Sequence, residues 1–107
     1  MLCRPTKEFT RYEAGLSLLP VLPPGDVAAL LEERCRRLSV EIEQNRNLRK
    51  LFPTERVPRL FWIEMEYRTT LREAELNWTR GLITDIESGA LEGMERWRAF
   101  HEEAAKD

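Results

Sequence analysis

Few side chains in this sequence could ligate a metal ion or act as a nucleophile. The single histidine, His101, is followed by Glu102 and Glu103. A metal site needs three or four converging ligands, and adjacent residues on a helix do not face one another. Cys3 and Cys35 lie far from His101 in the sequence, so no nucleophile is paired with a base. We therefore expect a solvated histidine, no metal site, no cofactor and no enzymatic activity.

Two glutamate pairs, Glu64 with Glu66 and Glu73 with Glu75, could suggest paired carboxylates. Residues two apart point to different sides of a helix. Glu66 and Glu73 do share a face, but they lie about two turns apart and no histidine-bearing partner pair accompanies them. The pattern therefore indicates a solvated or ion-paired helix surface.

The three tryptophans are the other residues that could recognise a ligand or a partner. Trp62 and Trp78 are separated by 16 positions, which places them about 160° apart around a helix. They therefore face different ways. We expect Trp78 in the core or at a dimer interface, and Trp97 to pack the last helix onto the others.

The composition is typical of one helical domain with a charged surface. The chain has 107 residues, 42% apolar and 34% charged, with 17 basic against 19 acidic side chains. This length allows one domain with a modest core. The charges are mixed along the chain and form no basic stripe, so we expect no direct nucleic-acid binding. No secretory signal or long apolar run is apparent, which predicts a cytoplasmic protein without membrane contact.

Apolar spacing predicts an all-α fold with two long helices and a short helix at each end. Residues 1–6 are expected to be disordered, and the helical domain to span residues 7–107. The first long helix should begin near Gly25 or Asp26, where Asp26 is either the N-cap or a first-turn acid. The helices are expected over residues 7–19, from about 25 to before Pro53, over 59–88 with a stop at Gly89, and over 91–105.

The first long helix carries an apolar ladder whose steps alternate between four and three residues. This is the heptad spacing of a helix that packs lengthwise against others. Cys35 lies within the ladder, so it should be a buried, unreactive thiol. The ladder consists of Val27, Leu31, Cys35, Leu38 and Ile42, continued by Asn45 and Leu48.

The second long helix carries two apolar rows, which indicates two contacted faces. The first row is expected to form the seam and consists of Leu60, Tyr67, Leu71, Ala74, Trp78 and Gly81 or Leu82. The second row consists of Phe61, Met65, Leu76 and Ile83. Two long helices joined by a short turn form an antiparallel hairpin that buries one seam only. We expect the other row to face the short helices or a second chain, completing the core as a helical-bundle dimer.

Two segments resemble the C-terminal effector and dimerisation domain of PadR-like transcriptional regulators. They are FTRYEAGLSLLPVLPPGDVAALLEERCRRL and MEYRTTLREAELNWTRGLITDIESG. Features similar to the family are the Leu-Leu-Pro helix end, the Leu-Pro-Pro connector and the two long helices in the same order. The matching positions are Leu18, Leu19, Pro20, Leu22, Pro23, Pro24, Leu30, Leu31, Tyr67, Glu73, Glu75, Trp78, Leu82 and Ile83.

The resemblance implies a dimerisation domain that acts by protein–protein association. In the family, a winged helix-turn-helix binds DNA and this helical part pairs two subunits, and no winged-helix region is present in this sequence. The implied partners are a second copy or a full-length winged-helix relative. Some members sense phenolic or drug-like ligands near the dimer interface. An alternative function is therefore a ligand-sensing domain in which Trp62 or Trp78 stacks on a flat molecule.

Overall fold

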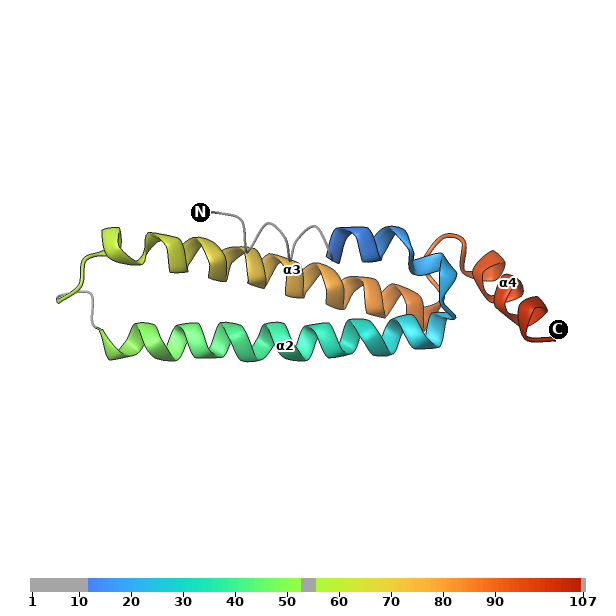
Figure 1. Cartoon of the computed structure of the whole chain (residues 1–107), viewed down its shortest axis with the longest axis horizontal. Coiled ribbons are helices and arrows are strands. Elements are labelled where there is room, and N and C mark those ends of the chain that lie inside the picture. Colours follow the sequence, from blue (N-terminus) through green and yellow to red (C-terminus); the bar gives the residue numbers. More distant parts are fainter. Residues whose placement is uncertain (1–11, 53–55, 107) are drawn as a thin grey trace.

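The computed structural model describes residues 12–52 and 56–106, with side chains as far as residue 104. These residues form helices and turns and contain no strand (Figure 1). The predicted all-α class is therefore confirmed for the described part of the chain. The disorder predicted for residues 1–6 lies outside it, as does the start of the predicted first helix.

Two long helices run side by side in opposite directions and form a hairpin (Figure 1). The hairpin makes the molecule elongated, with extents of 63 × 28 × 19 Å. In chain order, residues 12–17 are helical and are followed by η1 (Leu19–Val21), α2 (Pro24–Leu51), η2 (Arg59–Trp62), α3 (Ile63–Ser88) and α4 (Met94–Lys106). Within the described residues, no helix combines the length and the apolar character needed to cross a bilayer.

Proline and glycine set the ends of the long helices. Pro23 is extended and Pro24 occupies the first helical position of α2, where a missing N–H costs nothing. Asp26 therefore lies in the first turn and is not the N-cap. Gly89 ends α3 with a φ of 79°, in the left-handed region that glycine adopts readily.

The core lies between α2 and α3. The first five residues of the α2 ladder are buried, whereas Asn45 is half-buried and Leu48 is 43% exposed. The core therefore ends before the turn that joins α2 to η2 and α3. Its buried apolar residues are Val27, Leu31, Cys35, Leu38 and Ile42 from α2, Leu76, Ile83 and Ile86 from α3, and Met94 from α4.

In the middle of α3 the second row, and not the first, forms the core of the hairpin, whereas Phe61 at the start of the second row is 72% exposed and Met65 is half-buried. Leu76 and Ile83, from the second row, pack in the core with Ile86. From the first row, Tyr67 is 60% exposed and Trp78 is 55% exposed. The remaining first-row residues are also open to solvent at least in part: Leu60 and Ala74 are exposed, and Leu71 and Leu82 are half-buried.

Ion pairs across the hairpin explain this reversal. Glu75 of α3 accepts a hydrogen bond of 2.6 Å from Arg34 of α2, and Arg72 donates one of 3.0 Å to Glu41. Arg72 and Glu75 are themselves buried. A face with these polar residues packs on α2 because their charges have partners there. A search for apolar periodicity alone does not find such a face.

Candidate functional site

The side of α3 that points away from α2 carries no charge between Tyr67 and Leu82, about four turns, and Glu64 and Asp85 lie just beyond this stretch. We call this face the uncharged strip. In a chain with 34% charged residues, a solvated helix face of this length would be expected to carry several charges. The uncharged strip consists of Ile63, Tyr67, Thr70, Leu71, Ala74, Asn77, Trp78, Gly81 and Leu82.

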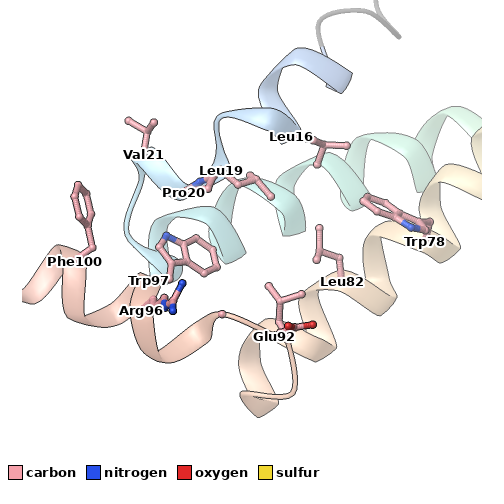
Figure 2. A pocket seen from close by; sticks show the side chains of 12 residues that line it. Leu16, Leu19, Pro20, Val21, Trp78, Leu82, Glu92, Arg96, Trp97 and Phe100 are labelled. Atoms are coloured by element: carbon pink, nitrogen blue, oxygen red, sulfur yellow. The ribbon is translucent and has the colours of Figure 1, made fainter.

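At its C-terminal half the uncharged strip becomes one wall of an open apolar groove of about 950 Å³. We call it the end groove. Figure 2 shows Leu19, Leu82 and Trp97 pointing toward its middle, with Val21 and Phe100 at its outer edge. It is lined by Leu16, Leu19, Pro20, Val21, Trp78, Leu82, Leu91, Glu92, Gly93, Arg96, Trp97 and Phe100.

Helix α4 forms one wall of the end groove and is held by hydrogen bonds to the connector that precedes α2. The indole Nε1 of Trp97 donates to the carbonyl of Leu22 at 2.7 Å. The ring Nε2 of His101 lies 2.9 Å from the carbonyl of Pro20. His101 is therefore half-buried and not the solvated residue that the sequence predicted, because α4 folds back against the connector.

The helix at residues 12–17 forms the opposite wall and is attached through Tyr12. The hydroxyls of Tyr12 and Thr79 share a hydrogen bond of 2.7 Å. The Arg34 guanidinium lies 4.8 Å above the Tyr12 ring and pairs with Glu75. Burial raises the pKa of the Tyr12 hydroxyl. This network joins the first helix, α2 and α3 at the edge of the end groove.

At the other end of α3, η2 exposes two large apolar residues. Leu60 is 71% exposed and Phe61 is 72% exposed; we call this pair the apolar tip. Figure 1 shows that the helix at residues 12–17 lies at one end of the hairpin, where Tyr12 contacts both Arg34 of α2 and Thr79 of α3. Among the residues that the structure describes, the end with the apolar tip is therefore the thin end and the end with the groove is the thick end.

The two tryptophans predicted to stack on a ligand do not share a site. Trp62 packs against Phe52 with ring centroids 5.8 Å apart, and Arg49 lies 4.8 Å above its ring. Trp62 lines a separate, more polar pocket of about 270 Å³. Trp97 joins Trp78 in the end groove instead. The sequence did not identify Trp97 as a groove residue, because this depends on how α4 returns to the connector.

Metal-ligating and thiol side chains in the described residues are dispersed or buried. The His, Cys, Asp and Glu side chains of these residues form no group of three that could hold a metal ion. Cys35 is buried, and burial raises the pKa of its thiol. Such a thiol is a poor nucleophile at neutral pH. The features of this structure that are suited to recognition are therefore apolar surfaces.

Comparisons with protein-family models, curated proteins and solved structures found no match to this chain. The resemblance to PadR-like regulators therefore stays a prediction. The description of the site rests on the geometry of the chain itself.

Proposed function

We propose that this chain is a helical dimerisation domain that acts by protein–protein association. The observation that carries the proposal is the uncharged strip. A single chain leaves Tyr67 and Trp78 more than half exposed, although burying an aromatic side chain is strongly favourable. A partner that covers this face removes the exposed apolar surface from water.

The available area supports a second chain as the partner. Seven large side chains on the uncharged strip, the apolar tip and the groove edge are about half exposed or more: Val21, Leu60, Phe61, Ile63, Tyr67, Trp78 and Phe100. If each leaves on the order of 100 Å² free, one copy offers roughly 700 Å². Each partner of a standard-size interface buries about 800 Å². The apolar face is therefore large enough for a specific homodimer.

The resemblance to PadR-like regulators gives this association a biological setting. In that setting the chain pairs subunits of a transcriptional regulator and neither binds DNA itself nor catalyses a reaction. The proposed partners are a second copy of this helical region or a full-length winged-helix relative. The mixed charge of the chain, with a net charge of −2, supports association with protein and not with nucleic acid.

Co-purification of tagged and untagged copies tests the proposed function. We expect the tagged chain to retain the untagged one, and Tyr67→Lys in both copies to abolish retention by placing a charge in the apolar interface. The control is Asn47→Lys, which adds the same charge on an exposed position of α2. Equal retention of the wild type and both variants would contradict an interface on the uncharged strip.

A ligand-sensing function is the second candidate, and the end groove favours it. Trp78 and Trp97 line an apolar groove of about 950 Å³, a size suited to small molecules. A panel of flat aromatic compounds should then change tryptophan fluorescence, and a Trp62→Phe variant should keep the response because Trp62 lies outside the groove. An unchanged spectrum at saturating concentrations would count against this function.

A further inference from the structure

We propose that the end groove is filled by the apolar tip of a second copy, in an antiparallel pairing of α3 with α3 about a two-fold axis near Ala74. The inference rests on the proposed function and specifies its geometry. Each copy then contributes one groove and one tip. The dimer contains two identical tip-in-groove contacts flanking a central helix pair.

The shape of the hairpin supports this arrangement. Among the described residues, the helix at residues 12–17 covers the end of the hairpin that carries the end groove (Figure 1). Leu60 and Phe61, at the thin end, are more than 70% exposed. An antiparallel pairing places the thin end of one copy against the thick end of the other. A parallel pairing places groove against groove and leaves both tips uncovered.

The spacing along the uncharged strip fits a two-fold axis near Ala74. Tyr67 and Gly81 each lie seven residues from Ala74, which is about 10 Å along the helix. Antiparallel pairing therefore places the aromatic ring of Tyr67 opposite Gly81 of the second copy. A Cβ added at Gly81 would meet no atom within 4 Å, so in the single chain this position is an open space on the helix surface.

Small residues at the axis allow the helices to approach closely. Ala74 would meet its own symmetry mate, and Gly81 would face the larger Tyr67. Alternation of small and large residues across facing positions is how helix surfaces interdigitate. Beyond Tyr67, the tip reaches the part of the groove formed by Leu91 and Trp97, where α4 begins.

The central part of this interface carries no charge, and the exposed acids Glu64 and Asp85 flank it. The uncharged strip carries none, and the charged side chains among the residues lining the end groove are Glu92 and Arg96. An apolar tip therefore enters a groove where few ionised groups need to be desolvated. A strongly polar or charged partner would find little complementary charge there.

Cysteine cross-linking tests the geometry in the full chain with Cys3→Ser. We expect Ala74→Cys to form a disulfide-linked dimer under mild oxidation, because the two copies meet at this position. Tyr67→Cys and Gly81→Cys should each remain uncross-linked alone and should cross-link when the two variants are mixed. All three positions are exposed in the single chain, so the substitutions should not disturb folding, which circular dichroism would verify.

A second pair of variants tests whether the apolar tip contributes to dimerisation. Phe61→Lys should weaken dimerisation at least tenfold, whereas Leu51→Lys should not, although both positions are 72% exposed. Cross-linking of Tyr67→Cys with itself, or equal affinity of the Phe61→Lys and Leu51→Lys variants, would overturn the antiparallel arrangement. A wild-type chain that still dimerises would in that case leave the proposed function standing. A monomeric wild type would overturn both.

Discussion

A hydrogen bond between Tyr12 and Thr79 fastens the helix at residues 12–17 to α3. The Thr79 side chain is fully buried, so its hydroxyl depends on partners within the protein. The Tyr12 ring also lies beneath the Arg34 guanidinium. One residue therefore positions the first helix and the groove wall that it forms.

Replacement of Tyr12 should change how the stability of the fold depends on pH. Burial raises the pKa of Tyr12 above its ordinary value of 10.0. Folding therefore favours the protonated hydroxyl, and this contribution to stability is present below pH 10 and is lost as the pH rises through the raised pKa. Tyr12→Phe should reduce the loss of stability between pH 9 and pH 11.

The same variant should also be less stable at neutral pH. The variant lacks the hydrogen bond between the Tyr12 and Thr79 hydroxyls, which should lower the free energy of unfolding by about 1 to 2 kcal/mol. Urea unfolding at neutral pH, pH 9 and pH 11 measures both effects. Ser17→Ala is the control, because it removes an exposed hydroxyl of the same helix that donates to the Ala14 carbonyl. An unchanged alkaline loss of stability in Tyr12→Phe would contradict the role given to Tyr12.

At the scale of elements, α4 is anchored less firmly than the two long helices. Its contacts with each other element are few compared with those between α2 and α3, and Met94 is its buried anchor. The Trp97 indole and the His101 ring attach it to the connector before α2. Local opening of α4 should therefore require less free energy than opening of the hairpin.

Trp97→Phe should loosen α4 without unfolding the hairpin. The change keeps an aromatic ring but removes the donor to the Leu22 carbonyl, a bond worth about 1 kcal/mol. Amide hydrogen exchange in α4 should become several-fold faster, and exchange in the buried part of α2 should stay unchanged. A Glu102→Gln variant serves as the control because Glu102 is an exposed residue of α4. Equal exchange rates in wild type and Trp97→Phe would show that the indole does not hold α4.

The sequence was informative about the elements and less so about their faces. Proline and glycine act through the backbone, so Pro24 and Gly89 mark helix ends whatever the tertiary structure. The ladder on α2 was also visible, because apolar periodicity reports a buried face. On α3, the buried face includes Arg72 and Glu75, whose partners lie about 30 or more residues earlier in the chain, so local periodicity could not identify it.

The sequence could not predict the end groove for a similar reason. It is formed by residues 16–21, the second half of α3 and α4, three segments that are distant in the sequence. Trp78 was recognised as a residue of an apolar row, but its neighbour Trp97 was not. Only the return of α4 to the connector brings the two indoles to one groove.

At the scale of the whole molecule, the shape and the apolar surface point to the same conclusion. A long hairpin is stabilised along one face of each helix, and here α3 has a second face on which Tyr67 and Trp78 stay more than half exposed among the residues that the structure describes. The uncharged strip joins the end groove at Trp78 and Leu82, and the apolar tip lies at the other end of α3. In the proposed dimer, a second copy covers all three surfaces.

The mass of the chain in solution tests this account most directly. Sedimentation equilibrium of the full chain over a wide concentration range should give twice the chain mass of 12.6 kDa. The Tyr67→Lys variant should shift toward the mass of a single chain. A wild type that remains at 12.6 kDa at every concentration would contradict the central claim that this domain functions by pairing.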